Sequence, residues 1–402
     1  MRLRQNKTIS FAFALIGILL GLSFAGCTQQ DSHNGQFLSK EYLPEYDMSP
    51  EYMSMCGRVD RAGQTYYLST EHWIKFYEMD THISGFLCNK PECTHDSDQC
   101  NAYLGFCLKG IHVYDGFIYW IKIDRGPSLW RMKLDGSEHE KVLSLDIDIS
   151  SISNYSFGIH RGFLYYYAIK EQMQNGQIVS AFFMIRYSLD DANNQGEVIY
   201  KEEYGHTSWS SVCFFRGKAY ALIQHQGISS EEATPFDNLI LIINLQDLAM
   251  EVIQGSKTEQ MISILASDNE LLVSSLYSYY NSFGTRINQY DFEKKEWLSG
   301  ELFYLEDPFV FSGRELLKGY WAEFVAIPYL EPGMRVFDWD GNLLFQKVVR
   351  GPIQGIALDE NGFLAIENIF IDEGPNAGND IIIFELISMD GETSTVLAEM
   401  IE

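Results

Sequence analysis

The chain has 402 residues, with 55 acidic against 29 basic side chains and a formal net charge of −26 at pH 7. This negative charge disfavours binding to nucleic acid and to anionic lipid headgroups, because their phosphates repel it. Hydrophobic residues make up 46% of the sequence, which is enough for a packed core. Length alone predicts two or three domains of ~150 residues each, unless the chain is built from repeats.

The first 26 residues combine a basic start with an apolar run. Three basic residues lie within the first seven positions, and an apolar run of about 15 residues follows, which is shorter than the roughly 20 residues of a membrane span. The run ends in Phe-Ala-Gly-Cys at residues 24–27. This arrangement resembles a bacterial lipoprotein signal peptide with its lipobox. The resemblance implies cleavage before Cys27, a lipid such as palmitate on that cysteine, and anchoring at the extracytoplasmic face of the cell membrane.

Residues 27–48 follow as the lipidated cysteine and a polar linker without periodicity. A flexible linker of about 20 residues has a root-mean-square span of roughly 25 Å, so it would hold the following domain near the membrane. Removal of residues 1–26 takes away three positive charges and leaves a net charge of about −29. We therefore expect a strongly acidic folded body that is tethered at one end.

A tight turn between two apolar strands recurs at intervals of about 50 residues, which is the period of a four-stranded propeller blade. These turns predict an all-β fold over residues 49–402, a seven-bladed β-propeller of four-stranded antiparallel blades. The alternative of two β-sandwiches is disfavoured, because the strands lack the alternating polar residues of an exposed face. The predicted turns are Arg61-Ala62-Gly63, Tyr114-Asp115-Gly116, His160-Arg161-Gly162, Phe215-Arg216-Gly217, Asp268-Asn269, Ser312-Gly313-Arg314 and Glu360-Asn361-Gly362.

The clearest repeat predicts strands at 106–114, 117–123, 129–134 and 139–145. Asp-Gly pairs join the first two strands and the last two, and both residues of such a pair accept positive φ in a hairpin turn. The second strand, Phe-Ile-Tyr-Trp-Ile-Lys-Ile, is apolar almost throughout. That pattern indicates a sheet covered on both faces, as a blade is covered by its neighbours.

Two segments carry family resemblances. The residues Ile-Tyr-Trp at 118–120 and Leu-Trp-Arg-Met-Lys-Leu-Asp-Gly-Ser at 129–137 resemble the YWTD-type repeat of low-density-lipoprotein-receptor-like propellers, although the YWTD tetrad itself is not kept. The segment from Cys88 to Tyr103 is similar to one in uncharacterised lipoproteins of anaerobic gut Firmicutes. The first resemblance implies a propeller and the second implies a lipoprotein, and neither implies a biochemical function.

Long connections are expected on one face of the propeller, opposite the uniformly tight turns. Variable loops on a rigid scaffold usually carry function, so this long-loop face is the predicted binding surface. Its connections are predicted at 170–180, 226–237, 277–285, 328–333 and 372–379, together with a cysteine-rich insert at 88–107.

Aromatic side chains are the predicted ligand contacts, because they combine apolar area with a polar edge that suits sugar rings and peptide backbones. The candidates in the 277–285 connection are Tyr277, Tyr279, Tyr280 and Phe283. Trp209 and Trp321, with His206 and Glu323, are candidates for the central channel. The alternative role for all of these residues is packing against or between blades.

The cysteine insert offers metal ligands or disulfide partners. Cys88, Cys93, His95 and Cys100 supply three thiolates and one imidazole within thirteen positions, enough for a closed tetrahedral zinc site of the structural kind. In an exported protein the same cysteines also suggest disulfides, with Cys93 paired to Cys100 and Cys88 paired to Cys56 or Cys107. The sequence leaves both interpretations open. Cys213 lies in an apolar run and is expected in the core.

Local catalytic signatures are missing from the sequence, including nucleophile elbows, zinc-protease motifs and phosphate or dinucleotide loops. We therefore expect a binding or scaffolding lipoprotein that captures a glycan, a peptide or a protein partner, and an enzyme is the less favoured reading. The alternative is a glycosidase or lyase acting on extracellular polysaccharide, with Glu323 as a candidate channel carboxylate. A third reading is a structural or regulatory protein that docks on a membrane partner. The sequence does not identify the ligand.

Overall fold

The computed structural model divides the chain into two units, residues 1–40 and residues 41–402, and the described residues all belong to the second. The predicted signal peptide, Cys27, most of the linker and Cys56 lie outside the described residues. Within the described part, no helix has the length and apolarity of a membrane span. The structure describes residues 52–53, 59–70, 72–147, 152–174, 177–191, 195–204, 206–226, 236–257, 259–267, 270–279, 282–299, 303–305, 313–317, 319–324, 333–340, 342–359, 361–370 and 380–401.

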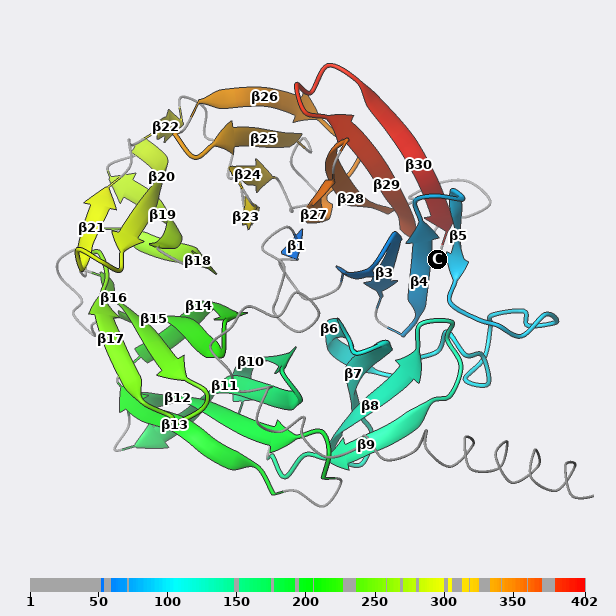
Figure 1. Ribbon diagram of the computed structural model, residues 1–402, viewed down its shortest axis with the longest axis horizontal. Helices are drawn as coiled ribbons and strands as arrows, with labels where there is room; N and C mark the ends of the chain where they lie inside the picture. The colour runs from blue at the N-terminus through cyan, green and yellow to red at the C-terminus, as the bar shows by residue number, and fades with distance from the viewer. Residues whose placement is uncertain are drawn as a thin grey trace, which may run out of the picture. The chain divides into compact units, whose positions relative to one another are not determined.

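These residues form seven antiparallel sheets that follow one another around a ring (Figure 1). Each blade consists of four strands consecutive in sequence. Blades one to three contain β2 (Val59–Ala62), β3 (Thr65–Ser69), β4 (Ile74–Glu78) and β5 (Ile83–Phe86); β6 (Cys107–Tyr114), β7 (Phe117–Ile123), β8 (Pro127–Lys133) and β9 (Glu140–Ser144); and β10 (Ile152–His160), β11 (Phe163–Gln174), β12 (Gln177–Ser188) and β13 (Glu197–Tyr204). Blades four to seven contain β14 (His206–Phe215), β15 (Lys218–Gln226), β16 (Phe236–Asn244) and β17 (Met250–Gln254); β18 (Gln260–Ala266), β19 (Glu270–Tyr279), β20 (Ser282–Asp291) and β21 (Glu296–Ser299); β23 (Gly313–Leu317), β24 (Tyr320–Phe324), β25 (Gly333–Asp338) and β26 (Leu343–Val348); and β27 (Ile353–Asp359), β28 (Gly362–Phe370), β29 (Asp380–Ser388) and β30 (Ser394–Ile401).

Strand β11 shows why these sequences form blades. Its side chains alternate between two neighbours: Tyr165 and Tyr167 pack against blade four, whereas Leu164 and Tyr166 pack against blade two. Because successive side chains of a strand point to opposite faces, a strand that is apolar throughout buries both faces only between two sheets. The prediction of an all-β propeller with seven four-stranded blades is confirmed.

The core consists of inter-blade clusters that continue around the ring, and one of them joins the last blade to the first. In this cluster Tyr66, Leu68 and Tyr77 of blade one pack against Leu364 and Phe384 of blade seven. The rings of Tyr77 and Phe384 stack with their centroids 5.4 Å apart. In the described part of the chain, hydrophobic packing therefore closes the ring. Neither the first nor the last blade takes its outermost strand from the other end of the chain.

Two short strands extend these sheets. Strand β1 (Tyr52–Met53) pairs with β27, the innermost strand of blade seven, through Tyr52 opposite Ala357 and Met53 opposite Ile356. Strand β22 (Phe303–Leu305) pairs with β20 in blade five. Residues 52–53 thus lie inside the ring, against the inner edge of the last blade (Figure 1).

Most of the predicted tight turns are confirmed, and the turn of blade six is displaced. Arg161-Gly162 and Arg216-Gly217 join first and second strands with positive φ at both positions. In blade six the predicted turn at 312–314 is wrong, because Gly313 begins strand β23. The turn instead contains Gly319, whose φ of +83° lies in the left-handed region that glycine adopts without strain.

Two of the predicted long connections are also wrong. Strands β11 and β12 pair from Phe163 opposite Ser188 to Gln174 opposite Gln177, so residues 170–180 form the end of a long hairpin. Residues 277–279 and 282–285 are likewise strand, with Tyr279 opposite Ser282. The centres of the predicted connections at 226–237, 328–333 and 372–379 lie outside the described residues. The connection from β5 to β6, which contains the cysteine insert, is confirmed as a long segment without strands.

Candidate metal centre

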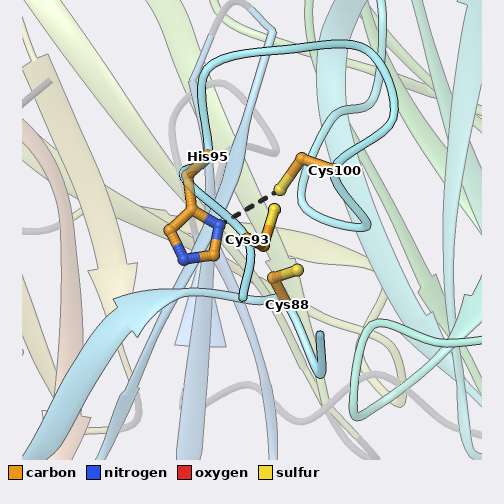
Figure 2. Close-up of side chains that lie close together, drawn as sticks. All are labelled: Cys88, Cys93, His95 and Cys100. Carbon is orange, nitrogen blue, oxygen red and sulfur yellow. Dashed lines mark hydrogen bonds between the residues drawn. The ribbon is translucent and has the colours of Figure 1, made fainter. Parts of the chain in front are cut away.

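The four predicted metal ligands come together in the connection between blades one and two. Cys88 follows the end of β5, and Cys93, His95 and Cys100 lie on the loop that leads to β6. Their ligand atoms, three Sγ atoms and one imidazole nitrogen, all lie within 4.8 Å of one another. Figure 2 shows the three thiols and the imidazole pointing toward a common point.

The spacing of these atoms fits a tetrahedral ion. Zinc binds sulfur at about 2.3 Å, which places two sulfurs of a tetrahedral site roughly 3.8 Å apart. The Nδ1 atom of His95 lies 3.2 Å from Sγ of Cys100 and faces the thiols (Figure 2). Three sulfurs and one nitrogen occupy all four corners of a tetrahedron, so such a site leaves no position for a substrate or a reactive water.

Backbone N–H groups favour the thiolate of Cys88, whereas burial disfavours that of Cys100. Burial acts to raise the pKa of Cys88, but the backbone N–H groups of Lys90 and Asn101 and the neighbouring thiols outweigh it, and the pKa is lowered. Burial raises the pKa of Cys100 to about 12, although its Sγ accepts a 3.3 Å hydrogen bond from the N–H of Ala102. A cation at the centre would stabilise the deprotonated form of both thiols.

Short turns place the ligands. The N–H of Cys93 donates to the carbonyl of Lys90 at 3.2 Å, and the N–H of Cys100 donates to the carbonyl of Ser97 at 3.0 Å. The ammonium of Lys90 also donates to the carbonyl of Gln99, which joins the two ends of the loop. His95 has a φ of 56°, so a left-handed backbone turn brings its ring back toward the cysteines.

The insert is fixed to both adjoining blades. The N–H of Ile74 on β4 donates to the carbonyl of Ala102 at 2.9 Å, and the indole of Trp120 on β7 donates to the carbonyl of Leu104 at 3.1 Å. The ring of Phe86 stacks on His95 with centroids 5.0 Å apart. The candidate centre therefore lies at the interface of blades one and two, beside the loop between β3 and β4.

Of the alternative disulfides, neither Cys93–Cys100 nor Cys88–Cys107 is formed in the described structure, and Cys56 lies outside it. None of the described cysteines lies at bonding distance from another, and Cys93 and Cys100 are both free thiols. The thiol of Cys107 instead donates to the carbonyl of Gly110 at 3.5 Å. Cys213 is 5% exposed and packs in the core between blades four and five, as the sequence predicts.

The predicted ligand-binding residues are dispersed. Trp321 on β24 is 1% exposed and stacks on Phe337 with centroids 4.1 Å apart, which agrees with the structural alternative. Glu323 on the same strand is fully buried. Trp209 lies on β14 opposite Ile223. Tyr277 and Tyr279 lie on β19, Phe283 lies on β20, His206 begins β14, and Tyr280 is outside the described residues.

Sequence reasoning missed a buried carboxyl pair, Glu367 and Glu385. Glu367 is fully buried and Glu385 is 5% exposed. A signal was available, because each glutamate interrupts an otherwise apolar strand: Phe-Leu-Ala-Ile-Glu in one and Ile-Ile-Ile-Phe-Glu in the other. A charged residue at an inward position of a doubly covered strand is rare unless it is paired.

The sequence matches no known protein family and no curated protein. Solved structures with a similar fold include the β-propeller domain of the Trilobed protease from Pyrococcus furiosus, at 12% identity and a TM-score of 0.45 over 86% of this chain and 97% of that chain. Acylaminoacyl peptidase from Pyrococcus horikoshii is similar at 13% identity and a TM-score of 0.48 over 88% of this chain, which spans about half (54%) of that protein. Oligogalacturonate lyase from Vibrio parahaemolyticus is similar at 11% identity and a TM-score of 0.45 over 90% of each chain. The protein is thus a seven-bladed propeller with distant similarity to peptidase and lyase propellers.

Proposed function

We propose that Cys88, Cys93, His95 and Cys100 bind one structural zinc ion, which holds the insert between blades one and two in a fixed conformation. The observation that carries this proposal is the convergence of four ligand atoms within 4.8 Å. Three thiolates and one imidazole are a ligand set typical of closed zinc sites. Residues 89–99 of the insert are mostly exposed, so this part gains little from burial, and metal binding would supply the missing stabilisation.

Native mass spectrometry of the mature soluble chain tests this proposal. We expect one zinc ion per chain, lost on treatment with a strong chelator and on substitution Cys100→Ser. Cys213→Ser is the matched control, because that thiol is also buried but lies outside the centre. A mass deficit of two hydrogens per cysteine pair, with no metal, would instead establish disulfides and contradict the proposal.

We further propose that the protein is a lipid-anchored, extracytoplasmic binding protein. The lipobox-like segment ending at Cys27 supports the anchor. The insert supports the binding surface because it is a long connection, fixed to both adjoining blades and predicted on the long-loop face. The ligand would be a glycan, a peptide or a protein partner. The closed ligand set of the centre favours a structural contribution of the metal to this face over a catalytic one.

Two measurements test this second proposal separately. Incorporation of a palmitate analogue, lost on Cys27→Ser, would establish the anchor, and unchanged labelling of the variant would rule it out. A thermal-melting screen against cell-wall fragments, glycans and peptides, with product analysis in the same wells, tests binding. A stabilising ligand without product supports a binding protein, whereas product formation would establish the glycosidase or lyase alternative.

A further inference from the structure

Glu367 and Glu385 face each other at the interface of blades six and seven. Glu367 on β28 is opposite Ile383 on β29, and Glu385 is opposite Ala365, so the two glutamates are diagonal neighbours on one face of the sheet. Phe363 and Ala365, on the same face of β28, pack against blade six. The two carboxyl groups are therefore enclosed between these blades and have almost no contact with solvent.

One oxygen of each carboxyl group is anchored. Oε2 of Glu367 accepts hydrogen bonds from the backbone N–H groups of Arg350 at 2.6 Å and Gly351 at 2.8 Å, in the connection from β26 to β27. Oε1 of Glu385 lies 3.8 Å from the ammonium of Lys347 on β26. The two glutamates of blade seven thus attach it to blade six. Glu385 contacts the last strand of blade six, and Glu367 contacts the connection that follows this strand.

The other two oxygens lack donors. Among the described residues, neither Oε1 of Glu367 nor Oε2 of Glu385 has a hydrogen-bond partner, and the two side chains lie within hydrogen-bonding reach of each other. Two ionised carboxylates in this position would repel each other in a site that water does not screen. A proton on either one would convert the repulsion into a hydrogen bond between them.

The local charge balance also favours one retained proton on the pair. The described charged groups beside the pair are Lys347, Arg350 and Glu399, and the guanidinium of Arg350 binds Glu399 on β30 at 2.7 Å. If all groups were ionised, three carboxylates would face two cations. One retained proton makes this interface neutral.

We propose that Glu367 and Glu385 share one proton at neutral pH and form a pH-sensitive latch between blades six and seven. Loss of that proton leaves two negative charges side by side. The carboxylate of Glu367 also holds the backbone of residues 350–351, so repulsion within the pair loosens this connection as well as the interface.

The direction of the titration agrees with this geometry. Burial, followed by the contact with Glu385, raises the pKa of Glu367 from 4.5 to about 7. When the pKa of a carboxyl group is higher in the folded state than in the unfolded state, its protonated form stabilises the fold. This stabilisation is complete at pH values below the pKa of the unfolded state. This contribution is lost as the pH rises through the folded pKa, so the interface weakens between about pH 5 and pH 8.

The substitution Glu367→Gln tests the latch in the mature, metal-loaded chain. The amide oxygen of glutamine can accept the two backbone hydrogen bonds, and its NH₂ group can donate permanently to Glu385. We expect the wild-type Tm to fall by about 4 °C more than that of E367Q between pH 5 and pH 8.5. Because both proteins keep the cysteine centre, its own pH dependence cancels in the comparison. Parallel pH profiles for the two proteins would overturn the proposal.

Further measurements separate this outcome from general effects. Glu140→Gln in blade two removes an exposed carboxylate that pairs with Arg131, and it should leave the pH profile of the wild type unchanged. Infrared spectroscopy should detect a protonated carboxyl group at pH 7 in the wild type but not in E367Q, and its absence from the wild type would contradict proton sharing. Stabilisation of the wild type by calcium chloride at pH 8.5, absent in E367Q, would assign the pair to a cation and overturn the latch.

Discussion

Two glycines of blade two, each following an aspartate, have similar positive φ values but different surroundings. Gly116 has a φ of +75°, and a Cβ at this position would meet nothing within 4 Å. Gly136 has a φ of +79°, and its Cβ would lie 2.3 Å from the carbonyl oxygen of Leu87, the residue before the proposed metal ligand Cys88. The two turns therefore separate the cost of a left-handed backbone from the cost of a steric clash.

We predict that Gly116→Ala lowers the free energy of unfolding by about 1 kcal/mol, the usual cost of a left-handed non-glycine residue. Gly136→Ala should cost about 3 kcal/mol, because Leu87 must also move. Since Leu87 adjoins Cys88, only Gly136→Ala should weaken zinc binding. Chemical denaturation and competitive zinc titration of both variants measure these effects. Equal losses of stability would show that the contact with Leu87 adds nothing.

The innermost strands of blades one, two and three are joined by a partly buried polar link. Oδ2 of Asp60 on β2 accepts a 2.7 Å hydrogen bond from the N–H of Val113 on β6 and lies 3.8 Å from Nδ1 of His112. Nε2 of His112 lies 2.9 Å from the carbonyl of Phe157 on β10. Burial raises the pKa of Asp60 and lowers the pKa of His112, because both charged forms are poorly solvated.

We predict that Asp60→Ala lowers the free energy of unfolding by roughly 2–3 kcal/mol, because it removes the acceptor for the N–H groups of Val113 and Arg61. Asp124→Ala is the control, since that aspartate is exposed in a loop of blade two. Equilibrium unfolding in urea measures both variants. A loss below about 0.5 kcal/mol for Asp60→Ala would show that water replaces the link.

At the scale of elements, the sequence predicted what depends on local pattern. Asp115-Gly116 and the apolar strand 117–123 predicted blade two almost to the residue, and four ligands within thirteen positions predicted the candidate centre. The ends of long hairpins were missed, because their residues are polar. A polar composition such as that at 170–180 is compatible both with a loop and with paired strands that extend beyond the core. In blade six Gly313 and Gly319 compete as turn residues, and only Gly319 lies between the two apolar runs that pair.

Long-range pairs were beyond such reasoning. Glu367 and Glu385 are eighteen positions apart on different strands, and their contact depends on the register of β28 with β29. The link from Asp60 to His112 joins two blades. Local sequence predicts the repeated unit, but contacts between units depend on how far each strand extends and which residue it faces.

At the scale of the whole molecule, the interface between blades seven and one differs from the others because the chain crosses it only through β1, which pairs with β27 and precedes β2 in sequence. Strand β1 adds a two-residue pairing at the inner edge of blade seven, and the cluster around Tyr77 and Phe384 packs blades seven and one together. Phe384 is fully buried. A matched residue at an internal interface is Phe182, which is also fully buried and packs between blades three and four.

We predict that Phe384→Ala and Phe182→Ala each lower the free energy of unfolding by about 3–5 kcal/mol, the usual cost of removing a buried ring. Their effects on native-state hydrogen exchange should differ. With Phe384→Ala, amides of β2–β5 and β27–β30 should exchange through a partial opening that precedes global unfolding, because the chain ties these two blades together only through the two-residue pairing of β1 with β27. With Phe182→Ala, the connection from β13 to β14 keeps the neighbouring blades adjacent, so exchange should accelerate evenly. Even acceleration in both variants would mean that the ring opens only on global unfolding, and that β1 with the remaining cluster is sufficient to keep it closed.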